Sequence, residues 1–332
     1  MTLAASTHSI PQSSGNNGEL IRAHVSAVRG IADDISCYEL WADHLPKFAA
    51  GAHVDVHLPG GLVRQYSLCN DPQENNRYVI AVLREKDGRG GSRYIHEHLR
   101  ANDELLISRP KNHFPLVLDK GTLHFIAGGI GITPIMAMLA ECTRRGADFH
   151  LHYCVRSRSR APFLDRLQPL LEAGKATIYV DDEGIKPDFR KILEHPGAGD
   201  HIYYCGPPGF MDHLAEVTRH WPPGSVHFER FTASTGQQAE AANQKNEAFE
   251  IRTARSGKSY TVQAHETIVE VLRRNGIQVD VSCEEGYCGT CMTRYVGGQP
   301  EHRDSVLDEA NRSNYVMICC ARAKEGPLIL DI

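Results

Sequence analysis

The most constraining feature of the sequence is a group of cysteines near its C-terminal end. Cys283, Cys288 and Cys291 are spaced C-x4-C-x2-C, and a further cysteine, Cys319, follows 28 residues after Cys291. This spacing is typical of chains in which four thiolates hold a 2Fe–2S cluster, because a short loop can then direct three sulfurs at one compact group. A structural zinc site is the alternative, but zinc sites usually combine two C-x2-C pairs, and this segment has only one. We therefore predict an iron–sulfur cluster.

The composition is that of an ordinary globular chain. Hydrophobic residues make up 41% and charged residues 23% of the 332 residues, which indicates two or three folded domains. Lys and Arg number 36 against 41 Asp and Glu, so the chain lacks the positive charge with which nucleic-acid-binding proteins neutralise phosphates. The longest stretch without charged residues, 121–140, contains four glycines and a proline, and we expect no membrane span. Residues 1–18 are predicted to be a disordered tail rather than a targeting peptide, and we expect a cytoplasmic protein.

The first segment, 19–117, is predicted to form a small antiparallel β-barrel. Its short β-prone runs are separated by turn residues, and only 91–99 has the pattern of a helix. The expected strands are 20–28, 53–58, 64–68, 78–83 and 104–108.

The second segment, 118–231, alternates strand-like and helical runs. Strict β–α alternation over about a hundred residues predicts an α/β domain with a doubly wound parallel sheet, in which ligands bind at the carboxyl ends of the strands. The expected strands are 123–127, 149–155, 176–180 and 201–205, and the expected helices are 134–145, 163–173, 187–194 and 208–220.

The third segment follows a predicted linker. Residues 232–248 are rich in Ala, Gln, Asn, Ser and Thr and have no periodic apolar face. In the segment 249–332 we predict a hairpin (249–253 and 259–262), then a helix (266–275) that ends at Gly276, and then the cysteine loop.

A tetrapeptide in the barrel segment resembles a flavin-binding motif. Arg64-Gln65-Tyr66-Ser67 is similar to the R-x-Y-S motif of the ferredoxin–NADP reductase superfamily. On a strand, alternation places Arg64 and Tyr66 on one face, where the guanidinium can bind a flavin phosphate and the phenol ring can stack on the isoalloxazine. The hydroxyl of Ser67 would lie near flavin N5. An ordinary strand with a surface arginine is the alternative.

Further residues of the predicted flavin site come from the next strand and helix. A helix start offers free backbone N–H groups to a phosphate. The residues concerned are Ala81, Val82 and Leu83 on the strand, and Gly90, Gly91 and Ser92 at the helix start.

Residues 128–134, G-G-I-G-I-T-P, follow a hydrophobic strand and begin a helix. The pattern is G-x-G-x-x-P, so it departs from the Rossmann fingerprint, but Gly129 and Gly131 would still let a pyrophosphate approach the backbone. Thr133 is the expected N-cap, with Pro134 as the first helical residue. The run Cys205-Gly206-Pro207 ends the fourth strand of the segment. A lone cysteine such as Cys205 is by default a buried small apolar residue.

The order of the three segments resembles that of the phthalate dioxygenase reductase family, which includes vanillate demethylase reductases. The resemblance extends from about residue 20 to the end and rests on RQYSLCNDPQE, NRYVIAV, GGIGITP, CGPP, EHRDSVL and LILDI. It implies a C-terminal plant-type ferredoxin domain of the α+β β-grasp fold, FMN rather than FAD, and NADH as the electron donor. It also implies a Rieske-type oxygenase as the acceptor, to which electrons pass from NADH through FMN and the 2Fe–2S cluster.

The resemblance also implies functions for single residues. Cys205, with Gly206 and Pro207, would lie beside the nicotinamide, and Phe231 would cover the flavin ring. Of the adjacent cysteines Cys319 and Cys320, the first matches the fourth cluster ligand, because 316–319 has the family's two apolar residues, one variable residue and the ligand. Apart from Ser67 and Cys205 near the reacting atoms, no catalytic residue is expected.

Some questions stay open at the level of sequence. The acceptor could be a cytochrome P450 or a di-iron hydroxylase, and a non-enzymatic iron–sulfur redox sensor is a further alternative. Arg156, Arg158 and Arg160 follow the second strand of the nucleotide segment and favour the 2′-phosphate of NADPH, whereas Asp181 and Asp182 follow the next strand and favour NADH. We expect NADH, a monomeric chain, and no contact with the aromatic substrate.

Overall fold

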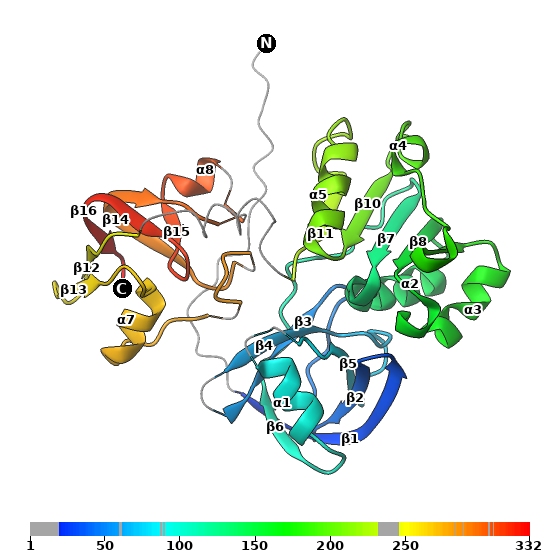
Figure 1. Ribbon diagram of the computed structural model, residues 1–332, viewed down its shortest axis with the longest axis horizontal. Coiled ribbons are helices and arrows are strands. Elements are labelled where there is room, and N and C mark those ends of the chain that lie inside the picture. Colours follow the sequence, from blue (N-terminus) through cyan, green and yellow to red (C-terminus); the bar gives the residue numbers. More distant parts are fainter. Residues whose placement is uncertain are drawn as a thin grey trace.

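The structure is a computed structural model that describes residues 20–59, 62–86, 88, 90–231, 246–281, 283–287, 289–304, 306–307 and 309–332. The described residues form three sheets with their helices, arranged around a common centre (Figure 1). The predicted tail, most of the predicted linker and Cys288 lie outside the described residues. Within the described ranges, no helix has both the length and the hydropathy needed to cross a membrane.

The first sheet is an antiparallel barrel of six strands in the order β4-β3-β6-β1-β2-β5. A bridge between Leu68 and Ile80 joins the two edge strands and closes the barrel. The sequence analysis did not predict β2, and it ended the first strand before Gly30. In the structure β1 continues to Ala32, and a tight turn in which Asp34 has a φ of 58° leads directly into β2. The elements are β1 (Ile21–Ala32), β2 (Ile35–Trp41), β3 (His53–His57), β4 (Val63–Ser67), β5 (Tyr78–Leu83), α1 (Gly91–His98) and β6 (Glu104–Ile107).

The second sheet is parallel, with the order β11-β10-β7-β8-β9. Its helices cover both faces, since α2 and α3 pack into one hydrophobic cluster and α4 and α5 into another. The chain adds β8 and β9 on one side of β7 and then β10 and β11 on the other, so the order of strands reverses between β7 and β10, and the carboxyl ends of these two strands form the switch point where ligands bind. The strands are β7 (Leu123–Gly128), β8 (Phe149–Val155), β9 (Ala176–Val180), β10 (His201–Cys205) and β11 (Val226–Glu229). The helices are η2 (Gly129–Gly131), α2 (Ile132–Arg145), η3 (Arg158–Arg160), α3 (Leu164–Glu172), η4 (Asp181–Glu183), α4 (Phe189–Ile192) and α5 (Pro208–Val217).

The start of α2 differs from the prediction. The N-cap is Gly131 and not Thr133, because the 3-10 turn η2 runs directly into the helix. Thr133 is already inside the first turn, where its Oγ1 donates a hydrogen bond to the carbonyl oxygen of Ile130 at 2.9 Å. The sequence prediction of Thr133 as the N-cap was therefore wrong.

The third sheet is mixed, with the order β13-β12-β16-β14-β15. A capping box begins its helix α7: the backbone N–H of Glu270 donates to Thr267 Oγ1 at 3.1 Å, and the backbone N–H of Thr267 donates to Glu270 Oε2 at 2.7 Å. Gly276 follows the helix with a φ of 74°, as expected. The elements are β12 (Phe249–Thr253), β13 (Ser259–Val262), α7 (Ile268–Arg274), β14 (Met292–Glu301), α8 (Glu309–Arg312), β15 (Tyr315–Met317) and β16 (Arg322–Leu330).

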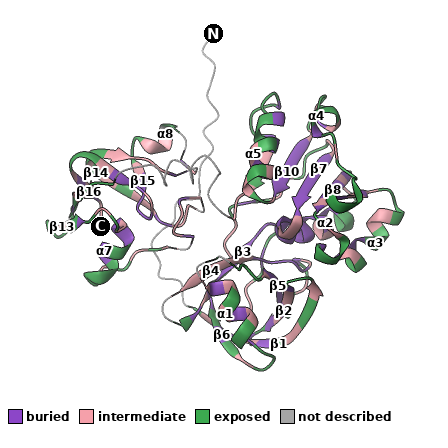
Figure 2. Cartoon of the chain, in the orientation of Figure 1, coloured by how far each residue is buried: buried purple, intermediate pink, exposed green. Residues whose placement is uncertain are grey.

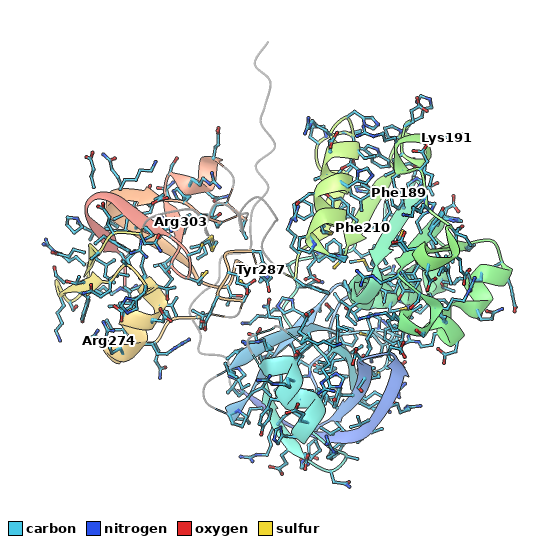
Figure 3. The ribbon with its side chains drawn as sticks, in the orientation of Figure 1. Phe189, Lys191, Phe210, Arg274, Tyr287 and Arg303 are labelled. Atoms are coloured by element: carbon cyan, nitrogen blue, oxygen red, sulfur yellow. The ribbon has the colours of Figure 1, made fainter. Side chains whose placement is uncertain are left out.

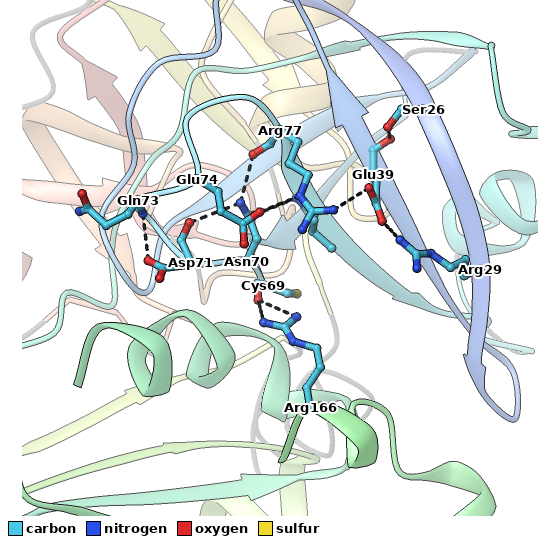
Figure 4. A network of polar contacts seen from close by, with 11 residues as sticks. Ser26, Arg29, Glu39, Cys69, Asn70, Asp71, Gln73, Glu74, Arg77 and Arg166 are labelled. Atoms are coloured by element: carbon cyan, nitrogen blue, oxygen red, sulfur yellow. Dashed lines mark hydrogen bonds and ion pairs between the residues drawn. The ribbon is translucent and has the colours of Figure 1, made fainter. Parts of the chain in front are cut away.

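The barrel and the parallel sheet share one hydrophobic core. One cluster of buried side chains extends from β1 through the barrel to α2, β8 and Tyr203 of β10, whereas the third sheet has a separate cluster. Figure 2 marks the buried residues of each sheet in purple. Polar contacts reinforce the junction: both terminal nitrogens of Arg166 on α3 donate to the carbonyl oxygen of Cys69 at 3.2 Å (Figure 4), and the backbone N–H of Val117 donates to Tyr203 Oη at 2.8 Å. The first two domains are therefore one packed unit.

Candidate functional site

A cleft of about 2110 Å³ is lined by residues from all three domains. Phe189 and Phe210 line it from the parallel-sheet domain, and Tyr287 of the cysteine loop lines it from the third domain, on the side that faces the other two (Figure 3). The residues predicted to bind a flavin, a nucleotide and a cluster therefore meet at one place in the molecule.

The R-x-Y-S residues lie on β4 and line the cleft. The Arg64 side chain packs against the first residue of α1, so that a Cβ on Gly91 would lie 2.7 Å from Arg64 Cγ and Nε. Gly90 precedes the helix with a φ of 85°, a conformation that favours glycine. The structure thus brings the arginine to the N-terminus of α1, as a phosphate site requires. Tyr66 is half-buried, and burial raises the pKa of its hydroxyl, which keeps the ring neutral.

The strand β5 contributes alternate residues. Ala81 and Leu83 line the cleft, whereas Val82 is buried in the barrel core. Ser92 also lines the cleft, and its Oγ accepts a hydrogen bond from the backbone N–H of Glu85 at 3.1 Å. Of the predicted residues on these elements, Val82 and Gly90 do not line the cleft.

The two motifs predicted to bind the nucleotide, 128–134 and 205–207, lie side by side, since Ala127 of β7 pairs with Cys205 of β10. Gly129 and Thr133 line the cleft, as do Gly206 and Pro207. Gly131 does not, and it has a packing function instead: a Cβ there would lie 2.2 Å from the carbonyl oxygen of Cys205. The Cys205 side chain is fully buried behind the cleft wall.

The structure adds a carboxyl group that the sequence prediction missed. Ser67 Oγ donates a hydrogen bond to Glu229 Oε2 at 3.4 Å, although 162 residues separate them. Glu229 ends β11, pairs with Cys205 on β10 and lines the cleft. Burial raises the pKa of Glu229 to about 8, and the hydrogen bond from Ser67 opposes that shift. The sequence prediction missed β11, and a glutamate between aromatic residues shows no motif by itself.

A second missed feature is a polar row on β3 and its neighbours. Gln65 Nε2 lies 2.9 Å from His53 Nε2 and 3.2 Å from Asp55 Oδ1. Lys111 Nζ forms an ion pair with Asp55 Oδ2 at 2.8 Å, and the His113 ring lies 5.3 Å from that of His53. The alternation His-Val-Asp-Val-His along β3 was the available signal for a polar face toward a site.

Three of the four predicted cluster ligands are buried and close together. Hydrogen bonding to Cys283, Cys291 and Cys320 raises the pKa of Cys319, so its thiol keeps its proton when no positive group is near. A positively charged iron group would relieve this, which makes the donor set suitable for a cluster. Among the described residues, no group of three or more His, Cys, Asp or Glu side chains is arranged so that it could hold a metal ion. That search does not include the fourth predicted ligand, Cys288, which lies outside the described residues.

Cys320 differs from its neighbour. It is half-buried, and its thiol points to the carbonyl oxygen of Met317 at 3.7 Å. Its sulfur also lies against the ligand loop, where a Cβ on Gly286 would come within 2.6 Å.

The arginines after β8 do not share one environment. Arg156 and Arg160 line the cleft together with Asp181. Arg158 is turned into a double contact with Glu183, at 2.6 and 3.0 Å. One of the three arginines, Arg158, is thus already paired with a carboxylate of the same chain.

Comparisons with known proteins agree with this arrangement. The model of the 2Fe-2S iron-sulfur cluster binding domain matches residues 251–324, and that of the oxidoreductase NAD-binding domain matches residues 125–216. The chain is 40% identical to a vanillate O-demethylase oxidoreductase of Pseudomonas putida over 94% of this chain and all of the relative. It is 38% identical to the phthalate dioxygenase reductase of Burkholderia cepacia, over 97% of this chain and 99% of the relative.

Two solved structures are similar over nearly the whole chain. A phthalate dioxygenase reductase, described as a modular structure for electron transfer from pyridine nucleotides to [2Fe-2S], has a TM-score of 0.74 and 38% identity and covers 94% of this chain and 98% of that one. An intact type IV self-sufficient cytochrome P450 monooxygenase has a TM-score of 0.80 and 37% identity over 94% of this chain. This chain spans only 41% of that longer protein.

Proposed function

The chain belongs to the family of phthalate dioxygenase and vanillate O-demethylase reductases, and on this basis we propose that it carries electrons from NADH through FMN and a 2Fe–2S cluster to a Rieske-type oxygenase. It is an oxidoreductase with an NAD-binding domain and a 2Fe–2S-binding domain. The observation that carries the proposal is the single cleft in which the R-x-Y-S residues, the two nucleotide motifs and the cysteine loop meet.

FMN is the flavin that the barrel residues suit. Arg64 and the N-terminus of α1 together form a site for a terminal phosphate. Tyr66 offers a half-buried ring for stacking, Gln65 and Ser67 lie beside it on β4, and Phe231 lines the cleft from the other side. When bound, the flavin would take two electrons from the nicotinamide and release them singly to the cluster.

The nucleotide would lie along the carboxyl ends of β7 and β10. Gly129 and the start of α2 would face its pyrophosphate, while Gly206 and Pro207 would hold the nicotinamide end next to Ser67. The chain's task is alignment, since the barrel and the parallel sheet form one packed unit and fix the two ligands relative to each other.

NADH is favoured over NADPH by the charges after β8 and β9. Arg158 is paired with Glu183 and so is not available to a 2′-phosphate. Asp181 places a negative charge at the cleft where that phosphate would bind. Arg156 and Arg160 remain to contact the pyrophosphate.

The cluster would be held by Cys283, Cys288, Cys291 and Cys319. Cys319 is the buried member of the adjacent pair and forms hydrogen bonds with Cys283 and Cys291 as well as with Cys320, whereas Cys320 is half-buried and its thiol also points to a backbone carbonyl. Electrons would leave the molecule from this domain.

The domain boundaries of the proposal are a barrel at 19–117, a nucleotide domain at 118–231, a linker at 232–248 and a ferredoxin domain at 249–332. The chain would act in the cytoplasm as a monomer.

A cytochrome P450 is the second candidate acceptor. The specific observation in its favour is the similarity of this whole chain to part of a self-sufficient P450 monooxygenase. The Rieske acceptor is preferred because the vanillate and phthalate relatives match this chain along nearly all of their own length.

Anaerobic titration of the purified protein with NADH tests the proposal. Flavin and iron–sulfur absorption bands should both bleach, the released flavin should be FMN, and kcat/KM should be higher for NADH than for NADPH. Reconstitution with a Rieske oxygenase and with a P450 then identifies the acceptor. Release of FAD, a preference for NADPH, or turnover with the P450 alone would each overturn the corresponding part.

A further inference from the structure

The carboxyl group of Glu229 has a second neighbour besides Ser67. His53 lies on β3 directly across from Ser67 on β4, and it is 3% exposed. Its Nδ1 is 4.0 Å from Glu229 Oε1 and, within the described part of the chain, has no hydrogen-bond partner. A buried ring nitrogen therefore faces the half-buried carboxyl group of Glu229.

The tautomer of His53 follows from the hydrogen bonds on its other side. Asp55, as the ion-pair partner of Lys111, can only accept hydrogen bonds. The Gln65 group next to Asp55 Oδ1 must therefore be the donating amide nitrogen, and the same nitrogen lies 2.9 Å from His53 Nε2. Since Gln65 donates there, His53 Nε2 accepts, and the ring proton of the neutral imidazole is on Nδ1.

The imidazole is neutral at ordinary pH. Burial and the neighbouring His113 lower the pKa of His53 to about 4, although Asp55 opposes this shift. The ring consequently presents one N–H to Glu229 and carries no charge.

We propose that His53 is a positioning residue, whose Nδ1–H is directed at Glu229 by the Lys111–Asp55–Gln65 row and favours loss of the carboxyl proton. A donor to a carboxylate stabilises its ionised form, and the side-chain hydrogen bond that Glu229 already receives, within the described residues, comes from Ser67. The inference deepens the proposed function, since Glu229 lies between Ser67 and Cys205, where the nicotinamide would meet the flavin.

The other charged groups near Glu229 are few within the described part of the chain. Cys205 faces it from β10, its thiol kept neutral because burial and Glu229 raise its pKa. Arg230 follows in the sequence but pairs with Asp212 on α5 at 2.8 Å. Burial raises the pKa of Glu229 to about 8 and the hydrogen bond from Ser67 opposes that shift, while His53 Nδ1 faces the carboxyl group at 4.0 Å.

The test is infrared difference spectroscopy of the full-length holoprotein as a function of pH, in which the carboxyl band missing from Glu229→Gln is assigned to Glu229. His53→Phe removes the donor and should move the midpoint of this band upward by about one pH unit, which is about tenfold tighter proton binding. His53→Gln keeps a donor and should restore most of the wild-type midpoint. His57→Phe, on the same strand and also lining the cleft, should have no effect.

An unchanged midpoint in His53→Phe, or equal shifts in His53→Phe and His53→Gln, would overturn the proposal. Should His53→Phe not fold, Gln65→Met takes its place: loss of the amide donor frees the ring proton to move to Nε2, and the midpoint should again rise, whereas no rise refutes the inference. Flavin reduction by NADH, measured on the same samples, shows separately whether the proposed electron transfer itself holds.

Discussion

A methyl group at position 131 would collide with the backbone of the neighbouring strand. In Gly131→Ala the new Cβ would lie 2.2 Å from the carbonyl oxygen of Cys205 and 2.7 Å from the nitrogen of Gly206. Packed atoms normally stay about 3.5–4.0 Å apart, so the start of α2 would have to retreat from β10 by about 1.3–1.8 Å. Most of the side chains on the first half of α2 are buried in the core shared with the barrel, and this movement would loosen their packing.

The cost follows from these contacts. Overpacking of a core usually costs about 1–3 kcal/mol, and we expect about 3 kcal/mol here, because the opposing atoms are backbone and cannot rotate away. For a unit of this size, about 3 kcal/mol corresponds to a drop in Tm of about 6–12 °C.

Gly129→Ala is the matched control. Gly129 has a φ of 54°, and a Cβ at this position would meet no packed atom within 4 Å, so alanine there costs only the strain of a left-handed backbone. That strain is about 1 kcal/mol, or about 2–4 °C in Tm.

Differential scanning calorimetry of the two full-length variants, with flavin fluorescence marking the transition of the first two domains, measures both values. A Tm of Gly131→Ala within about 2 °C of wild type (about 0.5–1 kcal/mol at this size), or an equal loss in Gly129→Ala, would refute the packing explanation. It would then favour the simpler view from the sequence, in which both glycines serve only the pyrophosphate.

Four further predictions follow from the sites. Cys319→Ser should lose the iron–sulfur absorbance while Cys320→Ser keeps it, and the reverse result would assign the fourth ligand to Cys320. Arg64→Ala should weaken FMN binding by about tenfold or more in equilibrium dialysis, because a charge-assisted phosphate contact of about 1.5–3 kcal/mol is lost. The pKa of Glu229 is raised from 4.5 to about 8, so between pH 4.5 and pH 8 the folded protein holds a proton that the unfolded chain has lost. The free energy of unfolding should therefore fall as pH rises through this range, by at most about 5 kcal/mol. In urea unfolding at pH 6 and pH 9, Glu229→Gln should not show this decrease. Glu183→Gln frees Arg158 and should raise the ratio of kcat/KM for NADPH over NADH by about threefold or more, and an unchanged ratio would show that this ion pair has no part in donor choice.

The features that the sequence predicted are those whose cause is local. The hairpin 249–253 and 259–262 has the predicted bounds, because alternation and a glycine turn both lie within fifteen residues. The strands 149–155, 176–180 and 201–205 likewise agree with the prediction, since buried parallel strands are continuous apolar runs between turn residues.

The features that the sequence missed depend on contacts made only in three dimensions. Glu229 gains its significance from Ser67, far away in the sequence, and from burial that no local pattern records. Gly131 looked like a ligand-binding glycine because its motif matches one, yet it faces the backbone of β10. Thr133 is a residue type that is common at N-caps, but the 3-10 turn η2 runs directly into the helix, which therefore begins at Ile132 with Gly131 as its N-cap.

The division of the interior into cores also determines where this protein can be recombined. A crossover between the barrel and the parallel sheet would split a continuous hydrophobic interior and separate Val117 from Tyr203, so hybrids joined there should misfold. A crossover within 232–248 leaves each interior intact. Recombination at that point would join the unchanged NADH-oxidising unit to a different ferredoxin domain, and so could supply electrons to a different oxygenase.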